Sequence, residues 1–177
     1  MARCRKPRFD LARLLGDKRI GLEARVEDAD HQSLKLWLRL LACSTQIETE
    51  IRRRLRDRFG VSLARFDYLA QLHRHPDGLR MNMLSRYLMV SGGNVTGLTD
   101  ELEKDGLVQR DDDPGDRRSY LVRLTAPGRL AFERMAVEHE GWVVELFAGL
   151  DPAQKKPLYE GLGRLRVQLA ELLDDER

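Results

Sequence analysis

The feature of the sequence that most constrains its fold is a pattern of helix, hairpin and helix between residues 91 and 128. Apolar residues recur at helical spacing and a helix-ending glycine follows them: Val95, Leu98, Leu102 and Gly106. Two short strand-like runs come next, at 107–110 and 120–124, and the nine residues between them are polar and rich in turn formers. The pattern therefore predicts a helix followed by a long β-hairpin with a polar tip.

Three more helices are predicted before this pattern. Apolar residues repeat every three or four positions over 31–59, and Gly60 is suited to end that helix in a left-handed conformation. Ser62 is a suitable N-cap for a second helix, which ends where residues 75–78 (His-Pro-Asp-Gly) interrupt the pattern. A short third helix is expected over 81–88.

Two helices are expected after the hairpin. Thr125 is placed to cap the first of them, with Pro127 in its first turn. Asp151, Pro152 and Gln154 form the pattern of a capping box, which predicts the start of the last helix. The chain is thus expected to be mainly α with a small β-hairpin wing, the arrangement of a winged helix-turn-helix protein.

Composition is that of a helix-rich globular chain, because 42% of the 177 residues are hydrophobic and 34% are charged. No run approaches the roughly 18 apolar residues that a membrane-spanning helix needs, and the start of the chain lacks the apolar core of a secretion signal. We therefore expect a cytoplasmic protein with no membrane partner. Cys4 and Cys43 lie far from any second cysteine or histidine at metal-ligand spacing, so reduced thiols and no metal or cofactor are expected.

Charge is concentrated at the start of the chain, although the net charge is only +2. Residues 1–25 carry eight basic side chains against three acidic ones. A basic arm over residues 1–30 could contact phosphates, and it could equally be a solvated tail.

The candidate contact surface is the fourth predicted helix, from Gly92 to Asp105, with Ser91 in the N-cap position. Two glycines in its first turn let backbone N–H groups and the positive helix end approach a phosphate closely. Nearby hydroxyl and amide side chains are suited to base edges and sugars. The candidate DNA-binding residues of this helix are Ser91, Gly92, Gly93, Asn94, Thr96, Gly97 and Thr99.

Four stretches of the chain resemble the multiple antibiotic resistance regulator (MarR) family. They are Phe66–Ala70, Val95–Arg110, Asp113–Ser119 and Val122–Gly128, and they include an Asp-Arg-Arg hairpin tip followed by a Leu-Thr-x-x-Gly helix start. The resemblance implies a transcriptional regulator, with a DNA-binding lobe at 61–124.

The resemblance also implies a homodimer built from helices in 31–60 and 125–177, with two recognition helices reading a palindromic operator in double-stranded DNA. Arg117 and Arg118 of the hairpin tip would enter the minor groove, where a guanidinium matches the negative potential. Asp116 would support the wing by orienting an arginine through a charge-assisted hydrogen bond. Repression is the output expected of such a regulator.

The charge of the predicted DNA-binding region departs from what DNA binding leads us to expect. Residues 91–124 hold eight acidic side chains against five basic ones, whereas a phosphate-binding surface should not be acidic overall. The acids are therefore expected to face away from DNA or to bind arginines.

Relatives in this family commonly bind a small effector between the lobe and the dimer helices, and this weakens DNA binding. The candidate lining residues are Trp37, Leu41, Cys43, Phe66, Tyr68, His73 and Met81, although residues of these types are more often plain core than ligand contacts. The sequences of residues 81–85 and 90–94 are similar to those of regulators of aromatic-acid breakdown. The expected effector is therefore an aromatic acid or its CoA thioester. Arg52 and Arg53, which begin the basic run at 52–56, could hold CoA phosphates. A basic run on a helix is, however, usually a solvated face.

Three alternatives remain. Redox sensing through Cys43 is less favoured, because the neighbours Leu41 and Ala42 suggest a buried, inert thiol with no base nearby. An enzyme is not expected, because the four histidines are scattered and no phosphate loop or nucleophile motif is present. A helical adaptor that binds only protein would explain the amphipathic helices but would leave the Asp-Arg-Arg hairpin without a role.

Overall fold

The fold is described from a computed structural model, which describes residues 14–15, 32–89, 91–113, 115 and 119–174. The chain divides into two compact units, Met1–Arg53 and Arg54–Arg177, and each is described by itself. Within the described residues, none of the helices combines the length and hydropathy needed to cross a bilayer.

The first unit contains most of α3 (Gln32–Phe59), which continues into the second unit. Several of its large apolar side chains are exposed, including Leu34, Leu36, Trp37 and Leu41, whereas Ile51 is buried. Near the end of the unit, Arg52 pairs with Glu48 one turn earlier on the same helix.

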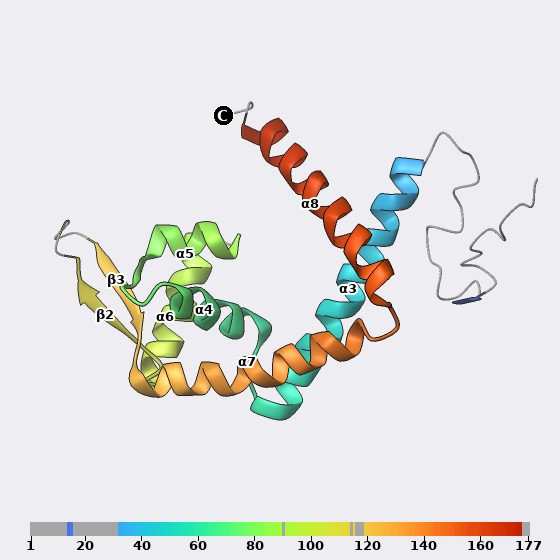
Figure 1. The fold of residues 1–177 in the computed structure, drawn as a ribbon. Coiled ribbons are helices and arrows are strands. Elements are labelled where there is room, and N and C mark those ends of the chain that lie inside the picture. Colours follow the sequence, from blue (N-terminus) through green and yellow to red (C-terminus); the bar gives the residue numbers. More distant parts are fainter. Residues whose placement is uncertain (1–13, 16–31, 90, 114, 116–118, 175–177) are drawn as a thin grey trace, which may run out of the picture. The chain divides into compact units, whose positions relative to one another are not determined.

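The second unit contains the remaining helices and all the described strands (Figure 1). In chain order they are α4 (Leu63–Arg74), β1 (Leu79–Arg80), α5 (Met81–Leu88), α6 (Gly92–Lys104), β2 (Val108–Asp112), β3 (Tyr120–Leu124), α7 (Ala126–Leu146) and α8 (Pro152–Asp174). The predicted order of helices, hairpin and helices is confirmed.

The strands form an antiparallel sheet in the order β1-β3-β2. The predicted hairpin is present, with Val108 opposite Leu124 at its base and Asp112 opposite Tyr120 near its tip. The sequence did not indicate β1, which pairs Leu79 with Val122 on the other side of β3. The hairpin is therefore joined to the segment that leads into α5.

The core of this unit is made by apolar side chains from nearly every element. Its fully buried members include Leu69 and Leu72 of α4, Leu84 of α5, Val95 and Leu102 of α6, and Val108 and Val122 of the hairpin. Burial of these side chains supplies the main force that holds the three helices against the hairpin.

The predicted caps are present at three helix starts. The hydroxyl of Ser62 accepts a hydrogen bond from the amide of Arg65 at 3.3 Å, and the hydroxyl of Thr125 accepts one from the amide of Gly128 at 3.0 Å. Asp151 and Gln154 accept hydrogen bonds from each other's amides at 2.8 and 2.9 Å, which is a capping box.

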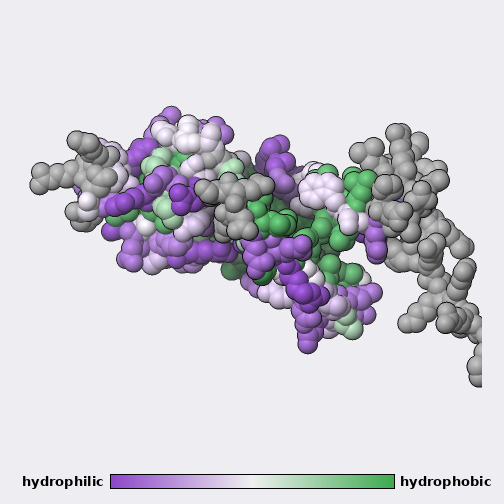
Figure 2. All heavy atoms as spheres, turned by 90° about the horizontal axis from the view of Figure 1, so that it is seen from above, coloured by the Kyte–Doolittle hydropathy of each residue, from purple (hydrophilic) through white to green (hydrophobic). Residues whose placement is uncertain are grey.

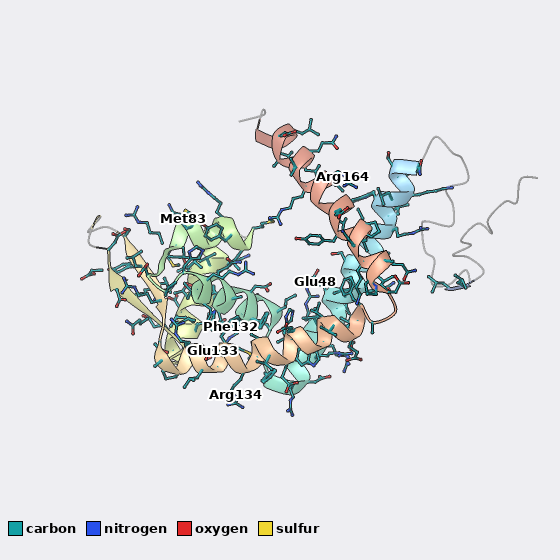
Figure 3. The ribbon with its side chains drawn as sticks, in the orientation of Figure 1. Glu48, Met83, Phe132, Glu133, Arg134 and Arg164 are labelled. Atoms are coloured by element: carbon teal, nitrogen blue, oxygen red, sulfur yellow. The ribbon has the colours of Figure 1, made fainter. Side chains whose placement is uncertain are left out.

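A row of rings joins α4 to α7. The ring of Phe66 lies 5.5 Å from Phe132 and 4.8 Å from His139, and Phe132 lies 4.8 Å from His73. In Figure 3, Phe132 lies on the side of α7 that faces α4, whereas Arg134 lies on the opposite side. Helix α7 thus packs along α4 through aromatic contacts.

Helix α8 keeps its apolar side chains exposed. Leu162, Val167, Leu169 and Leu172 are each at least 40% exposed, and Tyr159 is 81% exposed. Figure 2 shows hydrophobic as well as hydrophilic residues at the surface of the molecule.

Candidate nucleic-acid interface

Helix α5 ends at Met89. Met89 is 93% exposed and has a left-handed backbone, with φ of 53° and ψ of 38°. A left-handed backbone is costly for residues other than glycine, so the end of α5 at Met89 is a constrained feature of the fold.

The start of α6 is an open helix end. Ser91 has the extended backbone of an N-cap residue, but its side chain makes no capping hydrogen bond, contrary to the expected cap. Gly92, Gly93 and Asn94 in the first turn are exposed. The positive end of the helix is therefore accessible.

The glycines of α6 are not explained by the fold. A Cβ added at Gly92, Gly93 or Gly97 would meet nothing within 4 Å outside the neighbouring helix backbone, and none of the three has a positive φ. Glycine in a helix interior costs roughly 0.5 to 1 kcal/mol relative to alanine. Neither packing nor backbone conformation within this chain therefore explains why these exposed positions of α6 are glycines.

Two hydroxyl side chains predicted to contact DNA are placed differently. Thr96 is exposed, and its hydroxyl donates to the carbonyl of Gly92 at 3.1 Å. Thr99 is fully buried, so the expectation that it contacts DNA directly is wrong for this structure. Its hydroxyl lies 2.6 Å from that of Tyr68 on α4. Thr99 belongs to the core because it shares the face of α6 that carries Val95 and Leu102.

Several of the acidic residues are paired with arginines. Arg110 on β2 binds both Asp100 and Glu103 of α6, and the hydrogen bond with Asp100 holds the pKa of the Arg110 guanidinium above its usual range. Arg65 of α4 pairs with Asp105. These carboxylates therefore make structural contacts and leave less negative charge for an approaching phosphate.

The base of the hairpin tip is organised by Asp113. Its buried carboxylate accepts hydrogen bonds from Arg80 Nε at 2.5 Å, from the amide of Gly115 at 2.8 Å and from the hydroxyl of Ser119 at 3.0 Å. The hydrogen bond from Arg80 contributes most to lowering the pKa of Asp113 to about 2. Sequence reasoning missed this role. Its only signal was an aspartate that begins a turn-rich segment.

Arg117 and Arg118, expected in the minor groove, and Asp116, expected to orient an arginine, lie outside the described residues. In the described part of the tip, the carboxylate of Asp113 pairs with Arg80.

The residues predicted to line an effector site lie in both units. Phe66 and Tyr68 are buried core residues of α4, and His73 is partly exposed and lies 3.4 Å from a carboxylate oxygen of Glu133. Met81 is partly buried beside Thr99, with a sulfur-to-hydroxyl distance of 3.5 Å. Phe66, Tyr68 and Met81 therefore have structural roles within the lobe.

The remaining predicted effector residues lie on α3 within the first unit. Trp37 and Leu41 are exposed there, and Arg53 pairs with Glu50 at 2.7 Å. Cys43 is also exposed, so the expectation of a buried thiol is wrong for this structure. The error arose because neighbouring apolar residues in the sequence do not decide which side of a helix a residue occupies. Among the described residues no group of three or more potential ligands is placed to hold a metal ion.

A helix-turn-helix followed by an anchored hairpin is the architecture of a winged-helix DNA-binding protein. A MarR family sequence profile matches residues 59–119, which span α4 to the hairpin tip. The chain is 31% identical over 125 residues to the transcriptional activatory protein BadR of Rhodopseudomonas palustris. This match covers 70% of this chain and 71% of BadR. The chain therefore belongs to the MarR family.

Solved structures agree with this assignment. A MarR family regulator from Silicibacter pomeroyi matches with a TM-score of 0.66 and 33% identity, covering 83% of this chain and 99% of that protein. Sco3205 of Streptomyces coelicolor, a MarR family regulator solved in complex with DNA, matches with a TM-score of 0.68 and 28% identity, covering 80% and 89%. The predicted family and the winged helix-turn-helix fold are confirmed.

Proposed function

We propose that this regulator reads a specific palindromic operator as a homodimer, with the exposed side of α6 in the major groove. The observation that carries the proposal is the bare surface of α6, where Gly93 and Gly97 lie one helical turn apart and the fold requires neither. Both glycines are explained if a DNA duplex approaches the helix backbone closely, because a side chain at either position would stand in its way. The family membership and the solution of Sco3205 in complex with DNA support DNA binding.

The hairpin is proposed to contact the neighbouring minor groove through Arg117 and Arg118, with Asp116 orienting an arginine. The sequence of the tip supports this role, because guanidinium groups are attracted to the negative potential of a narrow minor groove. The described part of the hairpin adds support, since Asp113 ties both ends of the tip to the lobe.

Dimerisation is proposed to occur through the first and last two helices. Support comes from α8, whose leucines are exposed in the single chain. Exposed apolar side chains in this number are usually covered by a partner. A homodimer would place two copies of α6 about one helical turn of DNA apart, which matches a palindrome.

The regulator is further proposed to respond to a small aromatic effector, either an aromatic acid or its CoA thioester, with repression as the output. This effector class is supported by the similarity of the sequences at 81–85 and 90–94 to those of regulators of aromatic-acid breakdown. BadR is named as an activatory protein, so the direction of regulation needs its own measurement. A reporter gene under the operator, with and without the regulator, decides between repression and activation.

The function is tested by fluorescence anisotropy with a labelled duplex from the DNA upstream of the coding sequence. An unrelated duplex of equal length is the control, and the titration is repeated with aromatic acids and their CoA thioesters at fixed salt. Tight and selective binding that one compound releases supports regulator and effector together. Equal, weak binding to every duplex tested contradicts sequence-specific binding and favours the helical adaptor.

A second mode of regulation is redox sensing through Cys43, and the exposure of this thiol favours it. Mild peroxide should then weaken DNA binding in the unmodified chain but not in Cys43→Ser. If both proteins respond equally, Cys43 is not the sensor.

A further inference from the structure

Tyr68 and Thr99 form a buried hydrogen bond in the core of the DNA-binding lobe. The two hydroxyl oxygens lie 2.6 Å apart, and both side chains are fully buried. Tyr68 comes from α4 and Thr99 from α6. The pair therefore links the recognition helix to a helix that lies behind it.

The direction of this hydrogen bond follows from the other contacts of Thr99. The Thr99 hydroxyl has one proton, and the carbonyl oxygen of Val95 lies 2.7 Å away, closer than the sulfur of Met81 at 3.5 Å. A carbonyl oxygen is also the stronger acceptor. The Thr99 proton therefore goes to Val95, and Tyr68 donates to Thr99. Burial raises the pKa of Tyr68 to about 12, so the donor keeps its proton at neutral pH.

The three helices of the helix-turn-helix meet at Thr99. The phenol of Tyr68 reaches it from α4, and the sulfur of Met81 reaches it from the start of α5. Apolar contacts around it resist separation of the helices but carry little directional information. A hydrogen bond depends on distance and angle, and a buried hydroxyl that loses its partner is unfavourable.

Small rotations of α6 would break this hydrogen bond. At a helix radius of about 5 Å, a rotation of about 20° moves a surface atom by about 2 Å. Gly97 lies two positions before Thr99, about 200° around the helix, so the same rotation displaces the exposed side by a similar amount. Base edges are read by hydrogen bonds that do not tolerate such a displacement.

We propose that Tyr68 and Thr99 are positioning residues that set the rotation of α6, and so determine which base edges its exposed side reads. This inference rests on the proposed DNA-binding function. Neither residue contacts DNA; both act through the setting of the helix. The buried pair thus contributes to operator specificity more than to the affinity for DNA in general.

The test compares four variants of the full-length chain: Tyr68→Phe, Thr99→Val, the double variant, and Thr99→Ser. Thr99→Val is expected to lower stability, because it leaves the Tyr68 hydroxyl buried without an acceptor. The double variant should recover most of that stability, because it removes both polar groups at nearly constant volume. Thr99→Ser keeps the hydroxyl and is the conservative rescue.

The deciding readout is selectivity, measured as the ratio of Kd for an unrelated duplex to Kd for a duplex that the unmodified protein enriches from a random-sequence library. The double variant should lose about tenfold in this ratio, comparable with the loss of one base contact, although its stability is close to that of the unmodified chain. Thr99→Ser should keep the ratio within about twofold. Relative to the unmodified protein, amide hydrogen exchange in the double variant should accelerate more in α6 than in α7.

Unchanged selectivity and α6 exchange in a stable double variant would overturn the positioning role and leave the pair as core packing. Loss of selectivity in Thr99→Ser as large as in Thr99→Val would also overturn it, because the methyl group rather than the hydroxyl would then be responsible. If the unmodified protein enriches no duplex, the proposed function itself fails. That result is distinct from the other two.

Discussion

The carboxylate of Asp113 accepts a hydrogen bond from Nε of Arg80 at 2.5 Å, which ties the base of the hairpin tip to the residue preceding α5. The same carboxylate accepts hydrogen bonds from Gly115 and Ser119 on the two sides of the tip. One side chain thus fixes where the tip segment leaves and re-enters the hairpin, and joins the wing to the helix-turn-helix.

Asp113→Asn is expected to lower stability at pH 7, because the charge that these donors stabilise is lost. The pKa of Asp113 is about 2 in the folded chain, below its ordinary 3.8, so its contribution is present above about pH 4. That contribution decreases as the pH falls from 4 towards 2. Urea denaturation should therefore show a difference between Asp113→Asn and the unmodified chain at pH 7 that narrows by pH 3.

Asp112→Asn is the matched control, because Asp112 is the preceding residue and is exposed at the end of β2. A loss of stability in Asp112→Asn equal to that in Asp113→Asn would contradict the role given to Asp113.

Gly97→Ala should stabilise the fold while weakening DNA binding. Alanine is favoured over glycine in a helix interior by roughly 0.5 to 1 kcal/mol, and the added methyl meets nothing in the chain. Gly141→Ala on α7 is the matched control, since that glycine is also helical, exposed and without Cβ contacts, and light scattering checks that its dimer is intact. Thermal unfolding should show a gain for both variants, and anisotropy a loss of operator affinity for Gly97→Ala alone. Equal DNA binding by the two variants would remove Gly97 from the interface.

Gly128→Ala should be strongly destabilising, by about 3 kcal/mol or more. A Cβ at this position would lie 1.8 Å from the carbonyl oxygen of Leu107, which belongs to backbone that a side-chain rotation cannot move away. The close approach explains the glycine of the Leu-Thr-x-x-Gly pattern at the start of α7. Urea denaturation checks this, and wild-type stability in Gly128→Ala would show that α7 does not pack this closely against Leu107.

His139 should make stability depend on pH in the mildly acidic range. Burial lowers the pKa of His139 below its ordinary 6.5, and its ring lies 4.8 Å from that of Phe66. The folded chain therefore binds this proton less readily than the unfolded chain, so stability falls as the pH drops from 6.5 through the lower folded value. In His139→Phe the decrease in urea midpoint between pH 7 and pH 5 should be smaller. An unchanged decrease would place the titration elsewhere.

Arg118→Ala is expected to weaken operator binding by roughly 1 to 3 kcal/mol while leaving the dimer intact. The reason is the loss of a guanidinium from the minor groove. Anisotropy measures the affinity, and light scattering checks the oligomeric state. Unchanged affinity in an intact dimer would exclude Arg118 from the interface.

The sequence predicted the helices well because their apolar spacing is regular and their ends carry strong local signals, such as Ser62 and the Asp151 capping box. It did not predict β1, because a strand of two residues, Leu79 and Arg80, has no period to detect. Its partner on β3 lies more than 40 residues away in the chain. Pairing at that distance depends on tertiary contacts that local patterns do not contain.

The candidate site was predicted less completely. The exposed glycines of α6 were found from the sequence, but Thr99 was assigned to the DNA side on residue type alone. Its burial depends on a partner, Tyr68, that the sequence separates from it by 31 positions. The pairing of Asp100 and Glu103 with Arg110 was expected only as a general possibility for the acids, since local sequence does not identify ion-pair partners.

The central claim is that this chain reads DNA sequence as a dimer, and selection from a random-sequence duplex library tests it most directly. The unmodified protein should enrich a palindrome whose half-sites are separated by about one helical turn. DNase footprints on the enriched duplex should protect both halves together. Recovery of unrelated sequences after repeated rounds, with no shared motif, would contradict the claim.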